Sequence, residues 1–270
     1  MKQAALILVQ DLQDPTEKIN VLREYLQAFS LRSLHESRAF RCLSFVGGTA
    51  LRFLYSLPRF SEVLDFSLES ADGYMPKLWI TKIKRDFEFA GFTVTVTWNE
   101  RNVVNIAWIR VADLMKEAKL TDISQQKLSI KIEIDTKPPQ GALLQNSIID
   151  RHMIVAVRHH DLPSLLAGKI HALCTRKFLK ARDWYDLLWY GARRPVIHPN
   201  TTLLTHALVQ TGHELLQKPS EWQAYLFDRI IRIDQTKLQK DIRPFLEEPK
   251  DVYLLTKENL REAVAQTTST

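Results

Sequence analysis

The chain reads FVGGTALRFLYSLPRFSEVLDFS from Phe45 to Ser67. This order predicts a buried strand, a Gly47–Gly48 turn, an amphipathic helix and a second strand that carries Asp65. Backbone N–H groups of such a turn at a helix N-terminus can bind phosphate, and the hydroxyl of Thr49 could add a contact. A carboxylate a few residues later can hold the metal that accompanies phosphates. The segment therefore predicts a site that handles the phosphates of a nucleotide.

Length and composition limit the number of domains and the kind of partner only broadly. A length of 270 residues suits one large domain or two of ordinary size. A hydrophobic content of 45% is enough for a buried core. A net charge of +6 is compatible with a nucleic acid or nucleotide partner. Cys42 and Cys174 have no spacing typical of a disulfide framework or a zinc site. Apolar runs are too short to cross a bilayer, so we expect a reduced, cytoplasmic protein without a membrane partner.

The periodicity of apolar residues changes along the chain. It predicts helices that begin after Asp14 and at Pro76, and strands over residues 92–98, 103–111, 127–135 and 153–157. From Leu162 onward it predicts helices alone. We therefore expect an α+β protein, with an α/β core over residues 1–160 and an α-helical domain over residues 161–270.

A second motif is KLSIKIEID, which ends at Asp135. The two-residue period of a strand places Lys131, Glu133 and Asp135 on one face. Two carboxylates facing a cleft could supply a further metal ligand, or a base for an attacking hydroxyl. The same pattern also fits an ordinary antiparallel strand with one solvated face, and the residues alone leave both interpretations open.

A third motif begins the helical part of the chain. Lys169 and Arg176 are seven residues apart and share a helix face, and Asp183 and Asp186 follow in KARDWYDL. Cations placed in this way could neutralise charge on a transferring phosphoryl group or hold a nucleic acid backbone. The alternative is a solvated basic helix, with Asp183 capping the next helix.

Together these motifs resemble the AbiEii/AbiGii toxin family of nucleotidyltransferases, found in bacterial toxin–antitoxin and phage-defence (abortive infection) operons. The resemblance runs from about residue 15 to 195 and rests on GGTAL, RFSE-x-LDFS, KIEID-x-x-PP, LAGKIHAL and K-x-RD-x-YDL. It implies a DNA polymerase β-like core of mixed sheet and flanking helices, with a helical domain that contributes to the cleft. It further implies Mg²⁺, a nucleoside triphosphate, an RNA acceptor (tRNA for some relatives) and a cognate antitoxin.

The resemblance also implies residue roles. The residues implied in catalysis are Asp65, Glu133, Asp135, Lys169, Asp183 and Asp186. The residues implied in nucleotide binding are Gly47, Gly48, Thr49, Arg59, Ser61, Lys169 and Arg176, with Arg182 as a second-tier candidate. The metal ligands would be Asp65 and Asp135, with Glu133 as the alternative to Asp135.

One residue departs from the family pattern. The family has Asp-x-Asp where this chain has Val63 and Asp65. Two carboxylates spaced in this way can share two metal ions roughly 3.5–4 Å apart, but valine cannot ligate a metal. Glu62 would point to the opposite face of the strand.

The valine leaves several functions open. One is an enzyme attenuated by an Asp-to-Val change, which expression of a growth-arresting enzyme would select. Another is a catalytically inactive nucleotide- or RNA-binding module on the same fold. A third is a kinase-like phosphotransferase that uses the same carboxylates and Lys169.

Overall fold

The computed structural model describes residues 1–123 and 125–267. Their contacts divide the chain into two compact units. The first, here called the core unit, comprises Met1–Ser56, Phe60–Lys137 and Asn146–His159. The second, the helical unit, comprises Leu57–Arg59, Pro138–Gln145 and the chain from His160 onward. Two short segments that precede residue 160 therefore belong with the helices.

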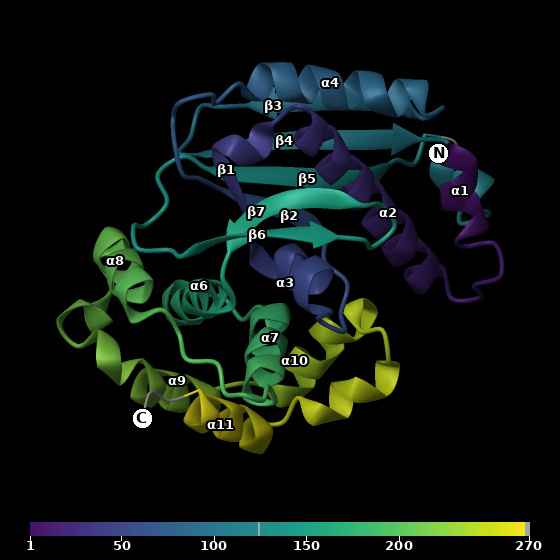
Figure 1. The fold of residues 1–270 in the computed structure, drawn as a ribbon. Coiled ribbons are helices and arrows are strands. Elements are labelled where there is room, and N and C mark those ends of the chain that lie inside the picture. Colours follow the sequence, from purple (N-terminus) through teal and green to yellow (C-terminus); the bar gives the residue numbers. More distant parts are fainter. Residues whose placement is uncertain (124, 268–270) are drawn as a thin grey trace. The chain divides into compact units, whose positions relative to one another are not determined.

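The core unit is built on a mixed seven-stranded sheet with the strand order β3-β4-β5-β2-β1-β7-β6 (Figure 1). The pairs β1–β7 and β2–β5 are parallel, whereas β1–β2, β3–β4 and β4–β5 are antiparallel. The strands are β1 (Leu43–Val46), β2 (Val63–Leu68), β3 (Thr93–Asn99), β4 (Val104–Ala112), β5 (Leu128–Asp135), β6 (Leu144–Ile149) and β7 (Val155–His160). The predicted mixed sheet is confirmed.

Helices cover one face of this sheet. Helix α2 (Pro15–Glu36) is capped at its N-terminus by Asp14, whose carboxylate accepts the N–H of Glu17. Helix α4 (Pro76–Phe89) has a proline as its first residue. Helix α2 packs on β5, α4 packs on β3, and the two helices pack on each other. Alternate residues of β4 and β5 are buried, which leaves the intervening residues partly exposed on the other face. The core unit is completed by α1 (Lys2–Ile7), α3 (Gly47–Tyr55) and α5 (Leu114–Glu117).

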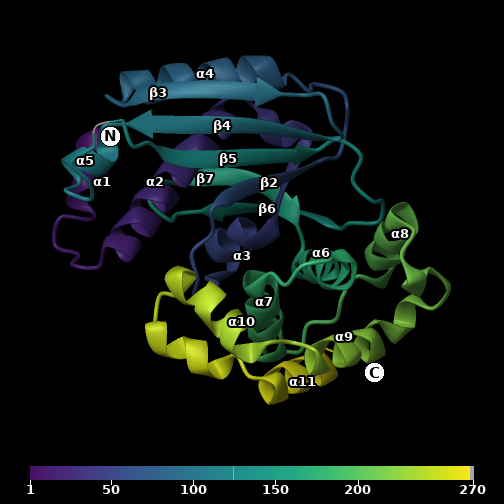
Figure 2. The same ribbon diagram turned by 180° about the vertical axis from the view of Figure 1, so that it is seen from behind.

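In the helical unit, every regular element that the structure describes after His160 is a helix, as predicted. Around α7, the helices α6, α10 and α11 pack closely (Figure 2). A Cβ at Gly191 would overlap Ala263, so this glycine allows α7 and α11 to approach. The α-helices are α6 (Leu162–Thr175), α7 (Ala181–Gly191), α8 (Thr201–Thr211), α9 (Trp222–Ile231), α10 (Gln235–Ile242) and α11 (Lys257–Gln266). Of the helices in residues 1–123 and 125–267, none has the length and apolarity needed to cross a bilayer.

Candidate functional site

Strand register brings two carboxylates together on the partly exposed face of the core sheet. Asp65 on β2 is paired directly with Glu133 on β5. The same transverse row continues to Val46 on β1 and to Ile106 on β4. Because paired residues on adjacent strands project from the same face, Asp65 and Glu133 are neighbours. We call this line of residues the carboxylate row.

The adjacent row of the same face carries a valine and a lysine and no carboxylate on β2 and β5. Val63 is paired with Lys131, and Lys131 is paired in turn with Trp108 on β4. The ammonium group of Lys131 forms an ion pair with Glu133 and lies 5.4 Å from the centre of the Trp108 ring. At the position where the resemblance implies aspartate, this chain therefore has an apolar side chain next to the ammonium group of Lys131.

Asp135 lies one row farther along β5, where it is paired with Ser67. Rows on one face are about 7 Å apart, since each residue of a strand rises by about 3.3 Å. The Oδ1 atom of Asp135 accepts the backbone N–H of Lys137 at 3.0 Å, which is the turn that ends the strand. The register thus favours Glu133 over Asp135 as the partner of Asp65, and the metal role of Asp135 stays a prediction.

Helix α3 begins against the carboxylate row. Gly47 has a φ of +79°, and a Cβ at this position would overlap the carboxylate of Asp65. Val46, the N-cap residue, provides no side-chain acceptor for the first N–H groups of the helix. The buried hydroxyl of Thr49 donates to the carbonyl of Val63 and so ties α3 to β2. If Thr49 contacts phosphate, it does so through its backbone.

A buried carboxylate holds α3 in place. Glu24 of α2 is 4% exposed and accepts hydrogen bonds from Arg52 of α3, from Nη1 of Arg151 at 3.2 Å and from Nε2 of His152 at 2.9 Å. Burial would raise the pKa of Glu24, but the hydrogen bond to His152 and the charge of Arg52 outweigh it and lower the pKa to about 2. The helix that begins at Gly47 is therefore anchored through Arg52.

The third sequence motif forms a charge network inside the helical unit. The Nζ atom of Lys169 lies 3.1 Å from Oδ1 of Asp183 and 2.7 Å from Oδ2 of Asp186. Arg59 forms a bidentate pair with Asp186, with both N–O distances 2.6 Å, and Arg176 pairs with Asp183. The structure thus brings together five of the residues that the sequence singled out. We call them the charge network.

Because most residues of the charge network are buried, each charge depends on its partners for stabilisation. Asp186 is 0% and Arg59 1% exposed, whereas the side chain of Arg176 is 34% exposed. Burial would raise the pKa of Asp183, but the charges of Lys169 and Arg176 outweigh it and lower that pKa. Burial would likewise lower the pKa of Lys169, but Asp186 and Asp183 raise it. Arg59 and Asp186 form a buried bidentate pair, and the predicted roles of Arg59 in nucleotide binding and of Asp186 in catalysis stay predictions.

Ser61 and Arg182 are two further residues that the sequence singled out. The carbonyl of Ser61 accepts the side-chain amide of Gln27 at 3.1 Å. The guanidinium carbon of Arg182 lies 4.3 Å from the centre of the Phe245 ring. Neither contact assigns a functional role to Ser61 or Arg182.

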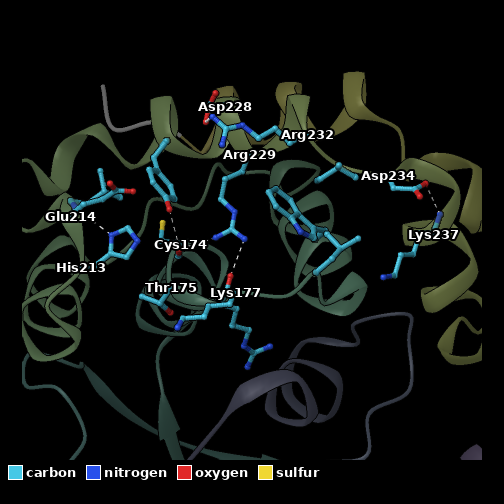
Figure 3. A pocket seen from close by; sticks show the side chains of 16 residues that line it. Cys174, Thr175, Lys177, His213, Glu214, Asp228, Arg229, Arg232, Asp234 and Lys237 are labelled. Carbon is cyan, nitrogen blue, oxygen red and sulfur yellow. Dashed lines mark hydrogen bonds and ion pairs between the residues drawn. The ribbon is translucent and has the colours of Figure 1, made fainter.

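A cavity of about 980 Å³ opens in the helical unit beside Arg176 (Figure 3). Arg229 reaches from α9 to the carbonyl oxygens of Cys174, at 2.8 Å, and of Arg176, at 2.9 Å, and so closes the end of α6. Arg232 pairs with Asp228 at 2.7 Å. No sequence motif singled out these residues of α9.

Within residues 1–123 and 125–267, no three His, Cys, Asp or Glu side chains gather in a way that could hold a metal ion. The carboxylate row offers two oxygen-bearing side chains, and a third ligand would have to come from a substrate or from water.

Residues 30–266 match the family model described as nucleotidyl transferase AbiEii toxin, type IV toxin–antitoxin system. Among solved structures, the chain is similar to a Helicobacter pylori protein provisionally assigned as a nucleotidyltransferase, with 18% identity, a TM-score of 0.56 and 92% of each chain covered. It is also similar to JHP933 from Helicobacter pylori, with 17% identity, a TM-score of 0.48 and 91% and 88% covered. No curated protein matches. The first structural similarity confirms the predicted fold.

Proposed function

Since the chain belongs to the AbiEii family of nucleotidyl transferase toxins of type IV toxin–antitoxin systems, we propose that it transfers a nucleotide from a nucleoside triphosphate to an RNA acceptor, with tRNA as the first candidate. The family also implies an antitoxin partner. The observation that carries the proposal is the carboxylate row. Asp65 and Glu133 are neighbours where α3 begins, and Gly47 leaves room for the Asp65 carboxylate.

The donor set fits a single Mg²⁺ ion. Mg²⁺ is usually held by one or two carboxylates, with substrate phosphates and water completing its octahedral shell. Asp65 and Glu133 would supply these carboxylates. An ion held there would polarise phosphoryl oxygens and neutralise charge on them. A second ion does not fit, because Val63 offers no ligand and Lys131 already brings a positive charge to that row.

The residues of the chain itself supply positioning and proton transfer. The first N–H groups of α3 bind the phosphates of the donor. The acceptor hydroxyl oxygen bonds to the α-phosphorus, the bond from that phosphorus to the bridging oxygen breaks, and pyrophosphate leaves. Glu133 accepts the hydroxyl proton. In the helical unit, Arg176 and Lys177 both line the cavity of about 980 Å³, and they are the cations that we propose for the RNA backbone.

The test is nucleotide transfer in vitro. The purified chain is incubated with Mg²⁺, total tRNA and one triphosphate at a time, labelled on either the α- or the γ-phosphate. We expect label from the α-phosphate alone to appear on RNA, above the background set by Asp65→Asn. Label from the γ-phosphate would instead indicate a kinase-like phosphotransferase. The second candidate function is the non-catalytic nucleotide- or RNA-binding module, and the presence of Val63 favours it. Binding of nucleotide without transfer, both before and after Val63→Asp, would indicate that module.

The strand register yields a paired prediction. Glu133→Gln is expected to lower kcat roughly 10- to 100-fold, because it removes the carboxylate beside Asp65. Asp135→Asn is expected to change kcat less than about threefold, because an amide oxygen can still accept the N–H of Lys137. Initial rates of label transfer measure both variants. The reverse order would show that Asp135, as the resemblance allows, is the catalytic carboxylate.

A further inference from the structure

The ammonium group of Lys131 lies beside the position at which a second metal ion would be expected. Carboxylates on residues 63 and 65 would hold a shared ion between their two rows, on the same face of the sheet. Lys131 is paired with Val63, and its ammonium group reaches toward the next row, where it forms an ion pair with Glu133, the strand partner of Asp65. Since adjacent strands are only about 4.8 Å apart, the ammonium group lies close to the place of that shared ion.

The start of α3 adjoins the same two rows. Thr49, in the first turn of α3, donates its hydroxyl to the carbonyl oxygen of Val63. Gly47, the first residue of the helix, lies directly against the carboxylate of Asp65. The N–H groups that we propose for the donor phosphates and the ammonium group of Lys131 therefore border one region of the core unit.

A second cavity, of about 450 Å³, opens in this region of the core unit. Val63 and Lys131 line it, and Arg23 and Lys127 add positive charge. Among the residues that the structure describes around the cavity, these three cations are accompanied by a single carboxylate, that of Glu62. A surplus of positive charge repels a free cation and attracts an anion. The lining therefore favours a phosphate group over a second metal ion.

Two contacts hold the ammonium group of Lys131 in place. It forms the ion pair with Glu133, and it lies 5.4 Å from the centre of the Trp108 ring, whose face attracts cations. The side chain of Lys131 is nevertheless 24% exposed, so a phosphate oxygen can reach it. An ammonium group acts on phosphate as a compact point charge, and one that is already positioned needs little rearrangement to do so.

We propose that the ammonium group of Lys131 replaces the second metal ion and binds a phosphate oxygen of the nucleoside triphosphate. Its charge neutralises the negative charge that develops on the transferring phosphoryl group. The carboxylates of Asp65 and Glu133 are left to a single ion. Lys131 keeps its protons throughout, so the bonds that form and break are those of the proposed transfer. The identity of the ligand rests on the proposed function.

The first test measures binding of triphosphate in the absence of metal. Each ribonucleoside triphosphate is titrated by isothermal calorimetry, in EDTA, into the unmodified protein, Lys131→Met, Lys131→Arg and the control Arg110→Met, each shown to be folded by circular dichroism. The guanidinium carbon of Arg110 lies 5.5 Å from the centre of the same Trp108 ring, yet the described lining of the cavity does not include Arg110. We expect Lys131→Met to weaken binding about tenfold, because a charge-assisted contact with phosphate is lost, and the other two variants to change it less than about threefold.

The second test compares Lys131→Met in two backgrounds. In the otherwise unmodified protein, we expect it to slow nucleotide transfer roughly 10- to 100-fold, because a positioned charge is removed. Combined with Val63→Asp, the same change should slow transfer less than about threefold, because two carboxylates can then hold an ion in place of the lysine. A lysine that only stabilised the sheet would matter equally in both backgrounds.

Three results would overturn the assignment. The unmodified protein could bind no triphosphate in EDTA, Lys131→Met could bind it as tightly as the unmodified protein, or Lys131→Met could transfer nucleotide faster, which would show that the lysine obstructs the site. The proposed function fails separately. Metal-free binding that needs Lys131, without any label transfer, supports the phosphate contact and rejects the enzyme. Label transfer without any effect of Lys131 on triphosphate binding rejects the role of Lys131 alone.

Discussion

Replacing Val63 with aspartate is expected to raise the rate of nucleotide transfer by roughly 10²- to 10³-fold. The register puts residue 63 beside Lys131, two positions before Asp65 on the same strand face. A carboxylate there would complete a pair that can share two metal ions, and a positioned charge at a developing phosphoryl transition state is worth about this factor. Initial rates with α-labelled triphosphate measure the change, and growth arrest on induction is a companion readout.

Matched controls separate the carboxylate from other effects of the substitution. Val63→Thr keeps the shape of the side chain without adding a carboxylate, and it is expected to leave the rate unchanged within about threefold. Binding of Mn²⁺, followed by electron paramagnetic resonance in the presence of a non-hydrolysable triphosphate, gives a second readout. We expect one ion per chain for the unmodified protein and two for Val63→Asp. A Val63→Asp chain that binds one ion and is no faster would contradict the two-metal explanation.

Local patterns predicted the elements of the site well. The alternation in KLSIKIEID correctly placed Lys131, Glu133 and Asp135 on the partly exposed face of one strand, because burial of every second residue is a local property of a strand on a core. The start of α2 directly after Asp14 was also predicted from a local signal, because Asp14 is a typical N-terminal capping residue. Strand β6 was not predicted. It lies at the edge of the sheet, and of its residues only Ile149 is buried, so it shows no alternation.

The pairing of distant residues could not be predicted. The choice between Glu133 and Asp135 depends on how β2 and β5 align, and a shift by two residues would exchange them without changing any local pattern. Arg59 is more instructive still. It stands six residues before Asp65 in the motif RFSEVLD, yet its partner is Asp186, 127 residues away in the helical unit. The position of Arg59 within the motif therefore gave no indication of this partner.

The charge network leads to the largest expected effect on stability. Asp186→Ala is expected to lower the free energy of unfolding by about 3–5 kcal/mol, because it leaves Arg59 and Lys169 buried without their shared carboxylate. Urea denaturation followed by circular dichroism measures the change. Asp228→Ala is the matched control. It removes the carboxylate of an exposed Asp–Arg pair with Arg232, which is worth at most about 1 kcal/mol.

Asp186 also lies in the motif that the resemblance assigns to catalysis, so stability and chemistry must be separated. Lys169→Met combined with Asp186→Ala removes both charges of one pair, and the double variant should be less destabilised than the sum of the two single variants. If the double variant is folded but transfers no nucleotide, the pair acts in catalysis as well as in folding. If it is folded and active, the network serves the helical unit alone. A loss for Asp186→Ala no greater than that for Asp228→Ala would show that burial does not make Asp186 critical.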